Sequence, residues 1–233
     1  MNRLRRSVAL AALSVVLGAG APVTSALDSQ YVLQRYALAI DAVPVPKNVV
    51  FTYTVSQLGP SNIEQRHTIY RSGPEVRDET LAVDGVALAR KIVRFSRRDD
   101  RYAVARLAPR AVAYQILFLR SSKEGPRYDY MFEVTPLLRQ SGASTDRMTI
   151  DGSRFLPRVL HFQTNGSDAK GTGEVVYAPF GQYWMPVLAT VDASVNGKPA
   201  RERITWGDYR FPEAFPPSTF QPPRPLPPAS PQP

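Results

Sequence analysis

Apolar residues change their spacing once along this chain. Across residues 28–43 they recur every three or four positions, which predicts one amphipathic helix with Asp28 or Ser29 at its N-cap. Pro44 and Pro46 end this pattern, because proline lacks the backbone N–H that a helix needs. Beyond them apolar and polar positions alternate, which is the period of a β-strand with one buried face.

Strands are therefore expected to make up most of the remaining chain. Turn signals between them, such as Asp84-Gly85 and Asn196-Gly197, favour antiparallel hairpins. The predicted fold class is mainly β (α+β): an antiparallel unclosed β-barrel, or half-barrel, with one or a few helices packed in its concave face. The predicted strands span residues 49–55, 63–71, 75–82, 86–97, 102–107, 114–119, 128–134, 156–163, 173–177, 184–193 and 201–209.

Four of these predicted strands have a less regular alternation of apolar and polar residues. Residues 86–97 and 102–107 are expected to pair around the charged turn 98–100. The apolar run 114–119 fits a strand or a helix and is taken as a strand. Residues 149–151 are expected to pause at Gly152 and then to continue as a strand from 156 to 163.

The first residues have the three parts of a secretory signal. Arginines at positions 3, 5 and 6 precede the apolar run 8–17, and small residues then allow cleavage after Ala26. Cleavage after Ala21 is the less favourable alternative, because Pro22 would follow the cut. An uncleaved anchor is a further alternative, although the apolar run is short against the ~20 residues that span a bilayer.

Domain organisation follows from these signals. Residues 1–26 are predicted to be a signal peptide that exports the protein to the periplasm, and 27–215 a single domain. Residues 216–233 are predicted to be a proline-rich disordered tail, since residues 212–233 hold ten of the 22 prolines. The chain has no cysteine, so in an oxidising compartment its fold relies on its core rather than on disulfides.

The chain carries a formal net charge of +9. An exported protein is a poor candidate for nucleic-acid binding, so the charge suits transient contact with an anionic membrane surface or with acidic envelope partners. A solvated basic face is the equally weighted alternative. The densest basic stretch comprises Arg90, Lys91, Arg94, Arg97, Arg98, Arg101 and Arg106.

Residues for catalysis or metal binding are sparse. His67 and His161 are the only histidines, and their spacing matches no zinc motif. The carboxylate pairs Asp78-Glu79 and Asp99-Asp100 are consecutive, so in strands their side chains point to opposite faces, and we interpret them as turn or surface residues. The sequence thus predicts no catalytic residues, no metal site and no cofactor: the protein is not expected to be an enzyme.

Aromatic residues are the more prominent feature of the strands. They are the residues of an ordinary core, or else the lining of a hydrophobic cavity between a curled sheet and its helix. The candidate cavity-lining residues are Phe51, Tyr53, Phe95, Tyr102, Tyr130, Phe132, Phe162, Tyr177, Trp184 and Trp206.

The second half of the chain resembles a known family. Its segments Met148–Asp151, Phe155–Val159, Gly173–Tyr177, Tyr183–Pro186, Arg201–Trp206 and Tyr209–Phe211, with the closing Phe215-Pro216-Pro217, are similar to those of the LolA/LolB-like outer-membrane lipoprotein-sorting and carrier superfamily. The resemblance implies an unclosed antiparallel barrel that binds acyl chains of lipids or lipoproteins. No binding residue of the family is carried over, because no matching motif is present. The proline-rich tail departs from the family pattern.

Two functions of different classes follow. The first is a periplasmic, monomeric carrier that holds the acyl chains of a lipid or lipoprotein in a hydrophobic cavity. The second is a non-catalytic structural protein of the cell envelope, in which the half-barrel is filled and an envelope protein binds outside it. A continuous cavity favours the first function, and a packed interior favours the second.

Overall fold

The computed structural model describes residues 27–59, 62–98, 100, 102–138, 143–165, 169–195 and 197–222. The predicted signal peptide and the last part of the proline-rich tail lie outside these residues. The helices are α1 (Ser29–Ala42), α2 (Val104–Leu107) and the 3-10 turn η1 (Pro217–Phe220). The strands are β1 (Asn48–Leu58), β2 (Ile63–Ser72), β3 (Glu75–Val83), β4 (Val86–Arg97), β5 (Tyr114–Glu124), β6 (Arg127–Pro136), β7 (Ala143–Asp151), β8 (Pro157–Asn165), β9 (Ala169–Phe180), β10 (Tyr183–Val195) and β11 (Lys198–Arg210).

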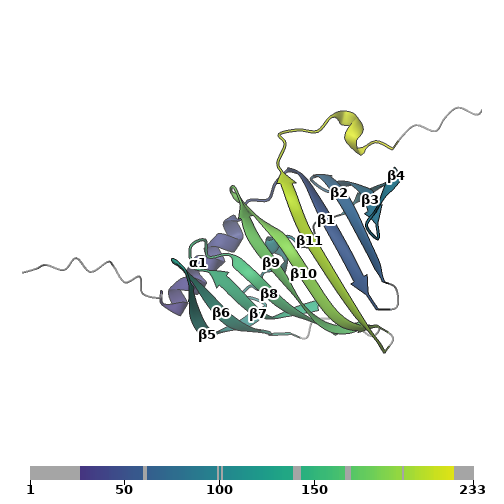
Figure 1. Cartoon of the computed structure of the whole chain (residues 1–233). Coiled ribbons are helices and arrows are strands. Elements are labelled where there is room, and N and C mark those ends of the chain that lie inside the picture. The colour runs from purple at the N-terminus through teal and green to yellow at the C-terminus, as the bar shows by residue number, and fades with distance from the viewer. Residues whose placement is uncertain are drawn as a thin grey trace, which may run out of the picture.

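All these strands form one sheet in the order β4-β3-β2-β1-β11-β10-β9-β8-β7-β6-β5. Two meanders, β1–β4 and β5–β11, are joined where the last strand β11 pairs antiparallel with β1. The sheet curls, with register shifts along several of its strand pairs that bend it locally, and its edge strands β4 and β5 do not pair (Figure 1). The predicted fold class, an unclosed antiparallel half-barrel, is confirmed.

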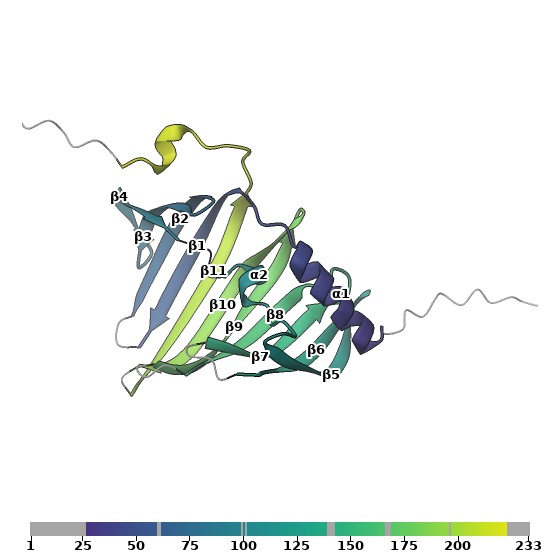
Figure 2. The same cartoon turned by 180° about the vertical axis from the view of Figure 1, so that it is seen from behind.

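Helix α1 forms where the sequence places it. The Asp28 side chain accepts hydrogen bonds from the backbone amides of Gln30 and Tyr31 at 2.9 and 3.2 Å, which caps the first turn. The helix ends at Ala42, just before the two prolines. Both α1 and α2 lie on the concave side of the sheet (Figure 2), as the sequence predicted for its single long helix.

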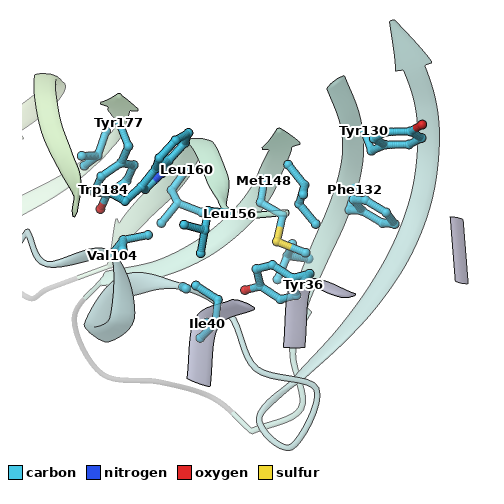
Figure 3. Packing of buried hydrophobic residues seen from close by; sticks show 14 of the residues in the cluster. Tyr36, Ile40, Val104, Tyr130, Phe132, Met148, Leu156, Leu160, Tyr177 and Trp184 are labelled. Carbon is cyan, nitrogen blue, oxygen red and sulfur yellow. The ribbon is translucent and has the colours of Figure 1, made fainter. Parts of the chain in front are cut away.

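The main hydrophobic core lies between α1 and the half of the sheet that runs from β6 to β10. Val32, Tyr36 and Ile40 form the buried stripe of α1 at four-residue spacing. Figure 3 shows Tyr36 and Ile40 together with the strand residues of this core, among them Met148 and Leu160. This half of the concave face is therefore filled.

Residues 98–113 connect the two edge strands, and we call this segment the strap. The expectation that 102–107 is a strand paired with 86–97 is wrong, because β4 pairs only with β3 and the chain has to cross from one sheet edge to the other. Residues 104–107 instead form the single turn α2, whose Val104 is buried in the main core. The Tyr36 hydroxyl donates a hydrogen bond to the Pro109 carbonyl and holds the far end of the strap on α1.

A second correction concerns residues 143–163. They do not form one interrupted strand: β7 and β8 are separate antiparallel partners, and β7 begins at Ala143 rather than at 149. Asp151 closes the connection, because its carboxylate accepts hydrogen bonds from the backbone amides of Ser153 and Arg154, both at 2.9 Å. The chain reverses within five residues and includes Phe155 at a φ of 56°.

The segment after β11 is ordered as far as η1. The Arg77 guanidinium donates to the Thr219 carbonyl at 3.3 Å, and the Thr219 residue is buried. Phe215 lies edge-on to both Tyr70 and Phe220, with ring centroids 6.3 and 5.3 Å apart. Residues 217–220 of the proline-rich tail thus form η1 and lie against β3, whereas 223–233 lie outside the described residues.

In the part of the chain that the structure describes, no helix is both long and apolar enough to cross a membrane.

Candidate functional site

A cleft of about 640 Å³ remains open on the concave face, over the half of the sheet that α1 does not cover. Its size falls within the range of small-molecule and cofactor sites. Strands β1, β2, β3, β4 and β11 and the strap contribute to its walls. The lining residues are Phe51, Tyr53, Val55, Gln65, His67, Ile69, Arg71, Asp78, Arg94, Arg98, Asp100, Tyr102, Arg106, Ile204 and Trp206.

The wall formed by β1 and β11 is apolar. Tyr53 lies opposite Trp206 in the antiparallel register, and Val55 lies opposite Ile204, so all four side chains face the cleft. Tyr102 of the strap meets the Trp206 ring edge-on, with centroids 4.9 Å apart and an interplanar angle of 68°. This apolar wall therefore consists of aromatic and aliphatic side chains on two neighbouring strands, and Tyr102 of the strap extends it.

The opposite wall, formed by β2, β3 and β4, is polar. His67 stacks on the Tyr53 ring at 4.6 Å, with the planes 5° apart, and its Nδ1 lies 2.8 Å from the Asp78 carboxylate. The His67 side chain is only 7% exposed, and its buried Nε2 has no hydrogen-bond partner among the described residues. A buried polar atom without a partner costs on the order of 1–3 kcal/mol, which a polar group from a ligand can offset.

Arginines outnumber carboxylates along this polar wall. Four guanidinium side chains and two carboxylates line the cleft. Asp78 receives a hydrogen bond from the Tyr53 hydroxyl at 3.5 Å and lies 3.9 Å from Arg98, in addition to its contact with His67. Asp100 accepts a hydrogen bond from the Tyr102 amide at 3.0 Å. The lining thus has a positive balance, and both carboxylates already have partners.

The strap is fixed over the cleft by a buried tyrosine. The Tyr177 hydroxyl of β9 donates a hydrogen bond to the Tyr102 carbonyl at 3.1 Å. Burial raises the pKa of Tyr177 well above its ordinary value, so the hydroxyl keeps its proton and remains a donor. This bond holds the backbone of the residue whose ring packs on Trp206.

Tyr177→Phe should loosen the strap locally. We expect a loss of about 1 kcal/mol in the free energy of unfolding, together with faster amide exchange in residues 102–108, because one buried carbonyl loses its donor. Hydrogen-exchange mass spectrometry measures this change. Tyr183→Phe is the matched control, since the Tyr183 hydroxyl makes no hydrogen bond with the described residues; equal exchange in both variants would refute this role for Tyr177.

The ten aromatic residues proposed from the sequence fall into different places. Phe51, Tyr53, Tyr102 and Trp206 line the cleft. Tyr130, Phe132, Tyr177 and Trp184 are at most 5% exposed and belong to the main core, and Phe162 is partly buried against it. Phe95 lies on the other face of β4, beside Phe220 of the C-terminal segment. Sequence periodicity could not separate these groups, because the position of α1 decides which part of the concave face is filled.

Sequence reasoning missed the polar wall. The alternation of Gln65, His67, Ile69 and Arg71 places them on one strand face, and this pattern was the signal that could have found them. The interpretation of Asp78-Glu79 as turn or surface residues is wrong. Both lie within β3 and point to opposite faces: Asp78 lines the cleft, whereas Glu79 is 3% exposed and pairs with arginine and lysine side chains on the other face.

Other polar groups are less suited to binding. His161 is partly exposed, and its Nδ1 lies 3.7 Å from Glu174. Among the described residues no three potential ligands gather to hold a metal ion. A depression of about 730 Å³ near the hairpin tips of β1, β9, β10 and β11 is shallow and lacks aromatic side chains. The cleft beside the strap is the better candidate.

Comparison with solved structures finds proteins of similar fold. A LolA superfamily protein from Nitrosomonas europaea is 11% identical, and the match covers 84% of this chain and 98% of that chain with a TM-score of 0.40. An outer membrane lipoprotein-sorting protein domain from Vibrio parahaemolyticus is 12% identical over 82% of this chain and 94% of its own, with a TM-score of 0.44. A DUF1329 family protein from Desulfovibrio piger is 12% identical over 82% and 97%, with a TM-score of 0.45.

Comparison with protein-family models gives no match, and neither does comparison with curated protein sequences.

Proposed function

We propose that this protein is a carrier or binding protein of the periplasm that holds the acyl chain of a lipid or lipoprotein in the cleft beside the strap. The observation that carries the proposal is the continuous apolar wall of β1 and β11, which faces an open space instead of a helix. Burial against such a wall yields about 25 cal/mol per Å² of apolar surface, and an alkyl chain offers this surface without polar groups to desolvate.

The division of the concave face supports this function. Over β6–β9 the core residues Phe132, Met148 and Leu160 are at most 1% exposed beneath α1, so no chain can enter there. Over β1 and β11, by contrast, Tyr53 and Trp206 are only partly buried. The half-barrel therefore combines a packed half that stabilises the fold with an open half that is free for a ligand.

Binding can be tested with an uncharged amphiphile, 1-monolauroylglycerol, by isothermal titration calorimetry. In Val55→Asp a carboxylate enters the apolar wall, and we expect the dissociation constant to rise at least about tenfold, since the chain would have to desolvate a charge. Thr54→Asp is the matched control: it is the adjacent residue of β1, equally half-buried, and its side chain points to the opposite face.

Val55→Trp, which fills the cleft without adding charge, should weaken binding to a similar degree. Circular dichroism of each variant establishes that it is folded. If both Val55 variants bind the amphiphile as well as the unaltered protein does, the ligand lies elsewhere. Absence of binding by the unaltered protein would refute the carrier function.

One observation favours the second candidate, an envelope protein that binds a partner outside its half-barrel. The edge strand β5 carries three consecutive exposed apolar residues, Leu117, Phe118 and Leu119, with exposed fractions of 50%, 44% and 46%. An unpaired edge strand presents free backbone groups to which another strand can add. If the amphiphile does not bind, binding of a protein partner at the edge strand β5 becomes the favoured function.

A further inference from the structure

The cleft is two-sided, and this division has a chemical consequence. Its apolar side chains come mainly from β1 and β11, whereas its charged side chains come from β2, β3, β4 and the strap. A molecule lying across it therefore meets an apolar surface at one end and guanidinium groups at the other. Only an amphiphile matches both walls at once.

Among the four arginines that line the cleft, Arg94 is the one whose charge the described residues leave without a partner. It lies directly opposite Asp78 in the antiparallel register of β3 and β4, so the two side chains start as close neighbours on one face. Yet Arg94 makes no ion pair or hydrogen bond with the described residues, because the Asp78 carboxylate is directed toward His67 and Tyr53, on the side away from β4. The Arg94 guanidinium remains exposed at the cleft wall.

Arg98 reaches the same carboxylate, Asp78, that lies opposite Arg94, and it is only weakly engaged. Among the described residues its single ion pair is this contact at 3.9 Å, the limit of such contacts, and its side chain is 56% exposed. Planar guanidinium groups bind carboxylates and phosphates through two parallel N–H donors. Two cleft arginines on either side of Asp78, both with little internal compensation, thus offer a recognition surface for one anionic group.

We propose that the ligand of this cleft is an anionic amphiphile, whose carboxylate or phosphate group binds Arg94 and Arg98 while its alkyl chain lies on the Tyr53–Trp206 wall. This inference rests on the proposed function, because it uses the same apolar wall. It adds that the site selects by head-group charge, and not by chain alone.

The expected selectivity is moderate. Both arginines are solvent-exposed, and ion pairs of exposed groups each contribute a few-fold to a binding constant, so two of them give about tenfold. Screening by salt should reduce this factor. The apolar contribution, in contrast, should be insensitive to salt.

The test compares three probes of equal chain length: lauric acid, dodecyl phosphate and the uncharged 1-monolauroylglycerol. Calorimetric titration of the purified protein should give dissociation constants about tenfold lower for the two anionic probes, and the difference should shrink at high salt. Arg94→Gln and Arg98→Gln should each weaken the binding of the two anionic probes by a few-fold more than that of 1-monolauroylglycerol, and so reduce the preference. Arg97→Gln is the matched control, because this residue of β4 projects from the other face and should change nothing.

The outcomes separate this inference from the function it rests on. Equal affinity for all three probes would overturn the anionic head-group site and leave the carrier function intact. Binding of none would overturn both. Inorganic phosphate and acetate, titrated alone, should bind at least about a hundredfold more weakly than the amphiphiles; affinity equal to theirs would mark a site for free anions and overturn the proposal.

Discussion

Phe132→Ala should destabilise the protein by about 3–5 kcal/mol, the largest effect that we expect from a single substitution. The Phe132 side chain is fully buried in the main core beneath α1, so its removal leaves a cavity that the surrounding strands cannot close. Urea unfolding followed by circular dichroism measures the change in the free energy of unfolding.

The neighbouring Phe118 provides the control. Its ring contacts Phe132 edge-on at 5.6 Å, but Phe118 lies on the edge strand β5 and is 44% exposed. Phe118→Ala should cost about 1 kcal/mol, since little surface leaves water at that site. Equal losses in the two variants would contradict the assignment of Phe132 to the core and return it to the residues available for a ligand.

Asp151→Ala should cost about 2–4 kcal/mol, because the Asp151 carboxylate organises the connection between β7 and β8. It accepts the two backbone hydrogen bonds from Ser153 and Arg154, and it lies 3.4 Å from Arg127. The residue is 4% exposed, so water cannot replace these contacts. Thermal and urea unfolding measure the loss.

Two further variants define the cause. Asp151→Asn keeps an acceptor oxygen for both amides and should therefore recover most of the stability. If the negative charge were the cause instead, Asp151→Asn would be as unstable as Asp151→Ala. Asp192→Ala removes an exposed carboxylate paired with Arg201 and should cost no more than about 1 kcal/mol. A loss in the control as large as that of Asp151→Ala would contradict the importance of burial.

The buried charges around Asp151 also show what kind of network the convex side of the sheet holds. Asp129 is its cross-strand partner, 2% exposed, and contacts both Arg127 and Arg158. Burial raises the pKa of Asp129, and the two guanidinium groups oppose this shift. These residues connect β6, β7 and β8 and lie away from the cleft, so we assign them to stability.

The fold was predictable because its elements are encoded locally. Helix α1 has its cap, its buried stripe at four-residue spacing and its terminating prolines within nineteen consecutive residues. Most strands show a two-residue period, bounded by turns such as Asp84-Gly85. The failure at 102–107 has a physical reason: this segment must bridge the unpaired edges β4 and β5, and only the completed sheet order reveals that requirement.

The cleft was predictable only in part. The period of two identifies Tyr53 and Trp206 as candidates with one apolar face, but it assigns Phe132 and Trp184 to the same class. Likewise, alternation along residues 86–97 places Arg94 and Arg97 on opposite faces, but only the pairing with β3 and the curl of the sheet show that the face of Arg94 is the one at the cleft.

The sequence by itself determined the elements, the antiparallel class of the sheet and the supply of aromatic and basic side chains, because the helix and strand periods, the helix cap and the turn residues are all properties of short segments of the chain. The tertiary structure alone decided that α1 covers one half of the concave face and leaves the other open. It also decided that Asp78 turns toward His67 and leaves Arg94 unpaired, since these outcomes depend on contacts between residues distant in the chain.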